Sequence, residues 1–254
     1  MDNPRVKVLG KAARLLKLLA DNPDATVPAL ALLLGEPRPT VYRLVQDLAV
    51  LDYVEEGSRP GTYRLGLELF RLGSLVALRL DVRDAAAPVM NEIHKKLEES
   101  VYLVIPRGYE AVCIERIEGL RIRSMALQLG GSLPLHLGAG PRLLLAYQPR
   151  EYWEEYFEEV KLEAMTPRTP TTRAGNVALL EEARRAGYAI SDEDVTVGIA
   201  SVGAPIFDHT GQVGAAVSVG GLRSAVLEDD NGERAVQLVT EGAAEISRRM
   251  GYQS

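Results

Sequence analysis

The sequence predicts an α+β protein in two parts, a small helical N-terminal domain and a larger domain with an antiparallel sheet. Three observations predict this. Residues 26–65 read as a short helix, a tight turn, a second helix and a hairpin, and residues 67–100 keep a helical spacing of apolar side chains. From Val101 the apolar residues alternate at period two, in hairpins separated by helical segments. A chain of 254 residues is long enough for two domains with cores of their own.

Three helices are expected in the N-terminal part. The first begins near Val6 and ends at Asn22-Pro23, and its predicted buried face is Leu9, Ala13, Leu16 and Ala20. The second has an apolar stripe of Val27, Leu30, Ala31 and Leu34, and Gly35 can take the positive φ that ends it. Pro39 suits the first turn of the third helix, whose predicted buried stripe is Val41, Leu44, Val45 and Leu48.

A hairpin follows these helices. The stretch VEEGSRPGTYRL supplies two short strands around a Gly/Pro/Ser turn, with Arg59 near the tip. Helix, turn, helix and hairpin in this order predict a winged helix-turn-helix. The alternative is a small helical subdomain whose exposed face carries two arginines. Residues 1–66 hold nine basic and eight acidic residues against 20 and 27 in residues 67–254, which is the direction expected of a DNA-binding segment.

The side chains expected to reach DNA lie on the third helix and the hairpin. Arginine and glutamine can read guanine and adenine edges in the major groove, whereas hydroxyl groups can hold phosphates. The arginine in the hairpin is expected at the minor groove or the backbone. The candidate DNA-binding residues are Arg38, Thr40, Tyr42, Arg43, Gln46 and Arg59.

The larger domain is expected to alternate strands and helices. A helical connector with a possible break at Gly73 precedes a hairpin over 101–118 that turns at Arg107-Gly108. An extended stretch over 122–137 leads to a helical segment, RLLLAY, and a helix over 176–187 ends at Gly187. A second hairpin over 197–221 turns at 208–211, and a last helix covers 231–250. The helices are expected on one face of the sheet.

Composition and motifs argue against several classes of protein. The single cysteine, Cys113, excludes internal disulfides, and its alternating neighbours predict a buried, inert thiol. No GxSxG, HExxH, GxxxxGK[ST] or GxGxxG motif is present. An enzyme built from His136, Ser201, Ser218, Asp192 and Asp194 is the alternative weighed against a regulator. We expect no catalysis, no metal and no cofactor, and, without a leader or membrane-spanning run, a cytoplasmic protein.

Several segments in the correct order resemble one family. These are Arg43-Leu44, the DYV that enters the hairpin, YRLG at 63–66, LPLH at 133–136 and, most specifically, GYAISDEDVTVGIASVGAPIFD at 187–208. Over about residues 5–250 the chain resembles the IclR family of bacterial transcriptional regulators. It departs from the family pattern at Asp194, where glutamate is usual, and at Pro141-Arg142, where Gly-Lys is favoured.

The resemblance implies a winged helix-turn-helix in residues 1–66, a helical linker in 67–84 and a GAF-like effector-binding domain in 85–254. It implies palindromic operator DNA bound by a homodimer or a dimer of dimers, and a small organic or aromatic acid as effector. The apolar faces of the first helix and the connector are candidate dimer surfaces, the latter through Leu67, Leu69, Phe70, Leu72, Leu75 and Val76. The alternative is a small-molecule sensor or scaffold without operator binding.

The resemblance also assigns a set of effector-binding residues. Their mixture of apolar walls, hydroxyls and small loop residues suits a small-molecule site. At Ala139-Gly140 the backbone amides have little side chain to shield them from a ligand carboxylate. Because the family often has Asp, Cys and Ser at positions 191, 201 and 220, we expect a less acidic and somewhat roomier pocket. The candidate residues are Ile122, Met125, Leu133, Ala139, Gly140, Ser191, Ile199, Ser201, Ser218 and Gly220.

Overall fold

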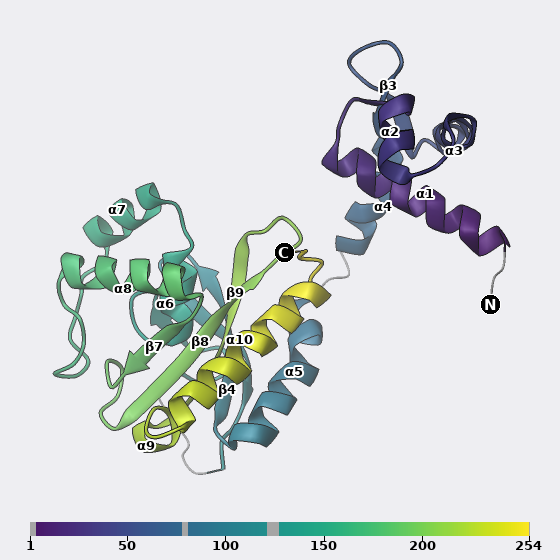
Figure 1. Ribbon diagram of the computed structural model, residues 1–254. Helices are drawn as coiled ribbons and strands as arrows, with labels where there is room; N and C mark the ends of the chain where they lie inside the picture. The colour runs from purple at the N-terminus through teal and green to yellow at the C-terminus, as the bar shows by residue number, and fades with distance from the viewer. Residues whose placement is uncertain (1–3, 78–80, 121–126, 254) are drawn as a thin grey trace. The chain divides into compact units, whose positions relative to one another are not determined.

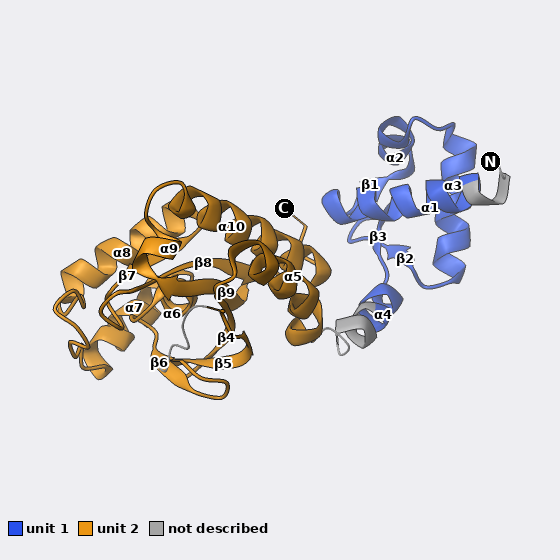
Figure 2. Cartoon of the chain, turned by 90° about the horizontal axis from the view of Figure 1, so that it is seen from below, with its two compact units in different colours: residues 1–79 blue, residues 80–254 orange. Residues whose placement is uncertain are grey.

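The computed structural model describes residues 4–77, 81–120 and 127–253 and divides into two compact units, residues 1–79 and 80–254 (Figure 2). The first unit holds three helices, a small sheet and a fourth helix (Figure 1). The elements of the first unit are α1 (Pro4–Asp21), β1 (Ala25–Thr26), α2 (Val27–Leu34), α3 (Arg38–Val50), β2 (Val54–Glu56), β3 (Thr62–Leu65) and α4 (Leu67–Ala77).

The core of the first unit forms where α1, α2 and α3 meet. The predicted stripe of α3 is confirmed, since all four of its residues are buried, and three of the four predicted for α2 are buried as well. The predicted face of α1 is wrong. The helix buries Leu15 and Leu19, whereas Leu9, Ala13 and Ala20 are exposed. A helix this rich in leucine and alanine has more than one apolar stripe, and packing against α2 selects the one through Leu15.

The small sheet has the strand order β1-β3-β2, and all its pairs are antiparallel. Strands β2 and β3 and the five residues between them form the wing. The turn before β1 is tied to this loop, because Asp24 accepts hydrogen bonds from the Ser58 amide at 2.8 Å and the Ser58 hydroxyl at 2.7 Å.

The second unit is built on a six-stranded antiparallel sheet with the order β6-β5-β4-β9-β8-β7. Both predicted hairpins are confirmed, and their turns contain Gly108 and Gly211 with positive φ. The elements of the second unit are α5 (Val82–Leu97), β4 (Ser100–Arg107), β5 (Glu110–Ile117), β6 (Ser132–Pro134), α6 (Ala139–Ala146), α7 (Arg150–Glu159), α8 (Arg173–Ala186), β7 (Ala189–Asp192), β8 (Ile199–Phe207), β9 (Val213–Leu222), α9 (Arg223–Val226) and α10 (Asn231–Arg249).

Helices cover both faces of this sheet, so the prediction of helices on one face is wrong (Figure 1). Along β4, Val101 and Leu103 pack toward α5 and α10, whereas Tyr102 and Val104 pack toward α6, α7 and α8. The central strands are therefore apolar on both sides. Such strands read as almost continuous apolar runs, and the alternation of a half-exposed sheet is missing from them.

Two more expectations about the second unit and its connector need correction. Gly73 lies inside α4, so the connector has no break there, and Asp81 caps α5 by accepting a hydrogen bond from the Arg83 amide at 2.8 Å. The extended stretch over 122–137 contributes only the three-residue β6 among the described residues, since 121–126 lie outside them.

Candidate functional site

The turn between α2 and α3 fixes how α3 is presented. Gly35 ends α2 with φ of 70°, and the first helix holds the turn from the other side. Arg14 donates to the carbonyl oxygen of Leu34 at 3.3 Å, and Lys11 pairs with Glu36 at 2.8 Å. These contacts fix the start of α3 through the residues before it, and they do not involve the side chains on its outer face.

The outer face of α3 carries the candidate DNA-binding residues. Arg38, Tyr42 and Gln46 are exposed at a spacing of four, which places them along one line of the helix, and Arg43 is exposed beside them. Thr40 is half-buried near the N-terminus. Within the described residues, neither Arg38 nor Arg43 takes part in an ion pair, unlike Arg64 and Arg71, which pair with Glu55 and Glu68. The unpaired arginines of α3 are available to an outside anion.

Arg59 is exposed in the wing loop, as predicted. The loop around it is ordered by Asp24, and by Thr62, whose hydroxyl donates to the Arg59 carbonyl oxygen at 2.6 Å. Gly57 is required where the loop passes Asp24, because a Cβ there would lie 2.0 Å from a carboxylate oxygen of that residue. Arg59 therefore stands exposed on a loop whose backbone is fixed by these contacts.

A small cavity of about 60 Å³ lies between the sheet and the start of α6. The structure brings eight of the ten candidate effector residues to its walls, and the other two, Ile122 and Met125, lie outside the described residues. It also adds residues that were not predicted. The walls are Tyr102, Leu127, Leu133, Gly138, Ala139, Gly140, Pro141, Ser191, Val195, Thr196, Ile199, Ala200, Ser201, Ser218 and Gly220.

Strand register explains why these residues meet. Ser201 pairs with Ser191 on one neighbouring strand and with Gly220 on the other, so the three lie side by side in one row. Ser218 and Tyr102 form the next row on the same face. Tyr102 was missed because it sits in an apolar run, where nothing in the sequence separates a core tyrosine from a cavity wall.

The helix α6 closes the cavity with its N-terminus. A Cβ at Gly203 would lie 3.2 Å from the Ala139 carbonyl carbon and the Gly140 amide nitrogen, so this glycine lets the first turn approach the sheet. Ser201 accepts a hydrogen bond from the Ala139 amide at 3.4 Å. Ser218 is 6 % exposed, and its hydroxyl has no hydrogen bond to the residues that the structure describes. A helix N-terminus with buried hydroxyls beside it favours a negatively charged ligand group.

The two departures from the family pattern meet behind this cavity. Arg142 of α6 forms a buried ion pair with Asp194 and donates to the Ile190 carbonyl oxygen at 2.6 Å. The side chain of Ser191 donates to the other oxygen of Asp194. A cation longer than lysine thus faces an acid shorter than glutamate, and each departure fits the other.

His136 lies in the loop before α6 and is 1 % exposed. Its Nδ1 is 2.7 Å from the Tyr156 hydroxyl, which also accepts a hydrogen bond from the His136 amide at 3.1 Å. Burial, and then the nearby Arg142 charge, lower the pKa of His136 to about 4. The histidine is therefore neutral at pH 7. Its hydrogen bond to Tyr156 of α7 indicates a structural role.

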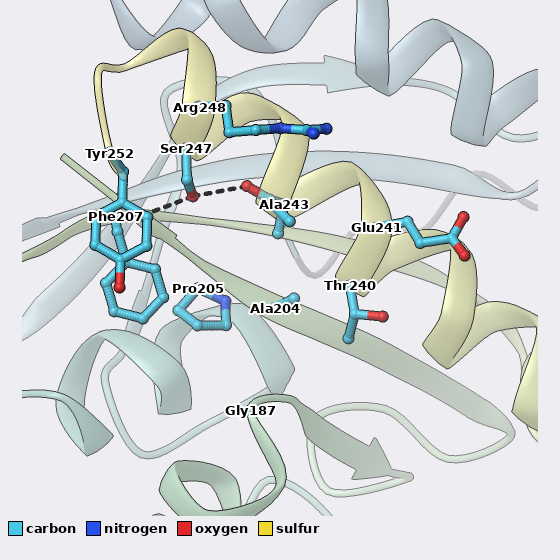
Figure 3. Close-up of a pocket in the computed structure, with 11 residues that line it drawn as sticks. Gly187, Ala204, Pro205, Phe207, Thr240, Glu241, Ala243, Ser247, Arg248 and Tyr252 are labelled. Atoms are coloured by element: carbon cyan, nitrogen blue, oxygen red, sulfur yellow. Dashed lines mark hydrogen bonds between the residues drawn. The ribbon is translucent and has the colours of Figure 1, made fainter. Parts of the chain in front are cut away.

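A larger groove of about 590 Å³ runs between β8 and α10 (Figure 3). Its polar side chains are already engaged within the chain. Ser247 donates to the Ala243 carbonyl oxygen at 2.7 Å and accepts from the Phe207 amide at 3.0 Å, and Thr240 donates to the Val236 carbonyl oxygen at 2.8 Å. Size alone does not make this groove a binding site, because convergent unused polar groups are missing from these walls.

Other features of the described residues bear on function. They hold no group of three or more His, Cys, Asp or Glu side chains that could bind a metal, and no helix among them is long and apolar enough to cross a bilayer. Cys113 is fully buried, as expected, and this burial raises the pKa of its thiol to about 11.

The chain matches known proteins over almost its whole length. The model of the IclR helix-turn-helix domain matches residues 8–58, and that of the bacterial transcriptional regulator IclR C-terminal domain matches residues 75–248. The chain is 33 % identical over 246 residues to the HTH-type transcriptional regulator KipR of Bacillus subtilis, covering 97 % of this chain and 98 % of KipR. It is 31 % identical over 234 residues to the HTH-type transcriptional repressor AllR of Escherichia coli, covering 91 % and 85 %.

Solved structures agree with these matches. The crystal structure of the Thermotoga maritima IclR is similar with a TM-score of 0.65 and 32 % identity, covering 97 % of this chain and all of that one. The exposed arginines of α3 therefore belong to a helix-turn-helix of a known kind. The chain belongs to the IclR family of bacterial transcriptional regulators, and it is a DNA-binding regulator and not an enzyme.

Proposed function

We propose that this regulator binds palindromic operator DNA as a dimer and changes its operator affinity when a small organic acid occupies the cavity behind α6. The observation that carries the DNA half is the face of α3, where Arg38 and Arg43 are exposed and unpaired among the described residues. We assign base contacts to Arg38, Arg43 and Gln46, phosphate contacts to Thr40 and Tyr42, and a minor-groove or backbone contact to Arg59.

A palindromic site requires two α3 helices at a fixed separation, which one chain does not supply. The candidate dimer surface on α4 is exposed and apolar: Leu67 is 74 %, Phe70 73 % and Leu72 36 % exposed, and Leu69 is half-buried. The side chains of Leu75 and Val76 lie outside the described part of the chain. Leu9 of α1, the other candidate surface, is 70 % exposed. We propose a homodimer, with a dimer of dimers as its larger assembly.

The effector half rests on the cavity between α6 and the sheet. We propose that the carboxylate of the acid accepts hydrogen bonds at the N-terminus of α6 and from Ser218. At about 60 Å³ the cavity is small. The effector is therefore a small acid, or the walls move apart to admit a larger one, and the residues of the cavity act as its binding site.

The proposed division of the chain follows from these roles. Residues 1–66 bind DNA, residues 67–84 link, and residues 85–254 bind the effector. A regulator of operator DNA works in the cytoplasm, with the chromosome.

A binding titration on DNA from upstream of the chain's own gene tests the proposal. The full-length protein is expected to shift this DNA and to lose the shift against an excess of the same fragment, but not against unrelated DNA. A small acid that binds the protein is expected to change the midpoint of the titration. If the protein binds acids but no DNA fragment from its own locus, it is a sensor without operator binding.

A further inference from the structure

Ser191 has a fixed hydrogen-bond direction. Its hydroxyl contacts the carboxylate of Asp194, and both residues are buried. A carboxylate in an ion pair only accepts hydrogen bonds, so the serine must be the donor. A hydroxyl has one proton to donate and two lone pairs that accept. With its proton used, Ser191 offers only lone pairs to a molecule in the cavity that it lines.

The surrounding contacts keep this direction locked. Asp194 is held by Arg142 through its carboxylate and by the Thr169 hydroxyl, which donates to its backbone carbonyl oxygen at 2.6 Å. Arg142 is in turn held by the Ile190 carbonyl oxygen. Turning the Ser191 hydroxyl toward a ligand would leave one oxygen of a buried carboxylate without a partner, which is unfavourable.

The other hydroxyls of the cavity are not restricted to accepting hydrogen bonds from a ligand. Ser201 accepts from the Ala139 amide, so its own proton is available to a ligand. The Ser218 hydroxyl is buried and has no hydrogen-bond partner among the described residues, so it can donate or accept. The cavity therefore offers donors near α6 and, at Ser191, an acceptor.

We infer that Ser191, positioned by Asp194 and Arg142, makes the cavity selective for small acids with a hydrogen-bond donor next to the carboxylate, a 2-hydroxy acid in preference to a 2-oxo acid. The inference rests on the effector role proposed above. A 2-hydroxyl donates to the lone pair of Ser191. An oxo oxygen has no proton, so it offers Ser191 nothing to accept and leaves the lone pairs of this buried hydroxyl without a hydrogen bond.

Calorimetric titration of the full-length protein with three acids of three carbons tests this. Lactate, pyruvate and propionate differ only at the second carbon, which carries a hydroxyl, an oxo group or hydrogens. We expect one enantiomer of lactate to bind about tenfold or more tightly than pyruvate, and propionate to bind more weakly than that enantiomer.

Two variants separate the role of Ser191 from that of the cavity in general. In Ser191→Ala the preference for lactate over pyruvate is expected to fall to about twofold or less. In the control Ser218→Ala both acids are expected to weaken while their ratio stays. Thermal unfolding confirms that each variant folds. Pyruvate binding as tightly as lactate, or a preference that survives Ser191→Ala, overturns the inference and leaves the effector site standing. If none of the three acids binds, the inference is overturned; the effector role itself falls only if a panel of larger organic acids also fails to bind.

Discussion

Arg142 and Asp194 form an ion pair in which neither side chain is more than 5 % exposed. The pair joins the helix that closes the cavity to the loop that follows Ser191, a residue of the opposite wall. Its two residues are 52 positions apart in the sequence, and both stand where the chain departs from the pattern of the family that it resembles.

Removing one charge of this pair is expected to destabilise the protein strongly. In Asp194→Asn, a buried guanidinium loses its counter-ion, and the expected loss in free energy of unfolding is about 3–5 kcal/mol. Denaturant unfolding measures it. The matched control is Glu181→Gln, which breaks the surface pair of Glu181 with Arg150 and should cost about 1 kcal/mol or less. Equal effects of the two changes would show that the buried pair has no special role.

The outer face of α3 is tested by Arg43→Ala. This side chain is exposed and unpaired among the described residues, so its loss should leave the fold intact. Operator affinity in a gel-shift titration is expected to fall by about 1–3 kcal/mol. The control is Arg185→Ala, the same change of charge at an exposed position in the second unit, which should bind like the unaltered protein. Unchanged affinity in Arg43→Ala would argue against α3 as the helix that reads DNA.

Two glycines of the sheet have different roles: Gly220 leaves space in the cavity, and Gly203 lets α6 pack close to the sheet. A methyl group at Gly220 would lie 3.4 Å from a ring carbon of Tyr102 and 3.5 Å from the Cβ of Ser201, which are ordinary contacts. Gly220→Ala is therefore expected to keep the melting temperature and to weaken acid binding about tenfold, because it reduces a cavity of about 60 Å³. Calorimetry measures the binding, and full affinity in this variant would place the effector elsewhere.

Gly203→Ala is the matched comparison, because it is expected to lower stability through the packing of α6. The added methyl group would lie 3.2 Å from backbone atoms of Ala139 and Gly140, so α6 would have to move away from the sheet. We expect a loss of about 1–3 kcal/mol in the free energy of unfolding, seen as a lower melting temperature. A variant that melts like the unaltered protein would show that the first turn of α6 adjusts freely.

His136 should make stability depend on pH. Its pKa is lowered from 6.5 to about 4 by burial, so between these values the unfolded chain binds a proton that the folded chain does not. The contribution of His136 to the free energy of unfolding is therefore expected to be complete above pH 6.5. It falls as the pH drops toward 4, by about 3 kcal/mol in total. The difference between the unaltered protein and His136→Gln, followed by denaturant unfolding across this range, isolates the contribution. A difference that stays constant with pH would contradict it.

Much of the fold could be predicted from the sequence because local signals and packing agree. The stripe of α3, the positive φ at Gly35 and the two hairpin turns are fixed by residues a few positions apart. The face of α1 was mispredicted because several of its apolar stripes are equivalent until α2 packs on one of them. The faces of the sheet were mispredicted because β4 is an almost continuous run of buried residues, whereas the prediction assumed the alternation of a sheet with one exposed face.

The cavity was partly predictable for a related reason. Leu133, Ser191 and Ser201 belong to segments that resemble the family, whereas Tyr102 reaches the cavity through its strand register with Ser218. The aromatic residues of α7 show the same limit. Acidic residues dominate its sequence and suggest a solvated face, yet Trp153 and Tyr156 on its inner side are among the largest fully buried side chains.

The bond between Asp24 and Ser58 has a consequence for how the wing meets DNA. A loop that is already ordered in the free protein loses little further conformational entropy when it binds, so less of the interaction energy is consumed in arranging it. Hydrogen bonds to Ser58 also lower the pKa of Asp24, so its carboxylate stays charged even in mildly acidic solution. The turn after the first helix thus acts as a brace for the loop that carries Arg59, the residue that we propose to contact DNA from the wing.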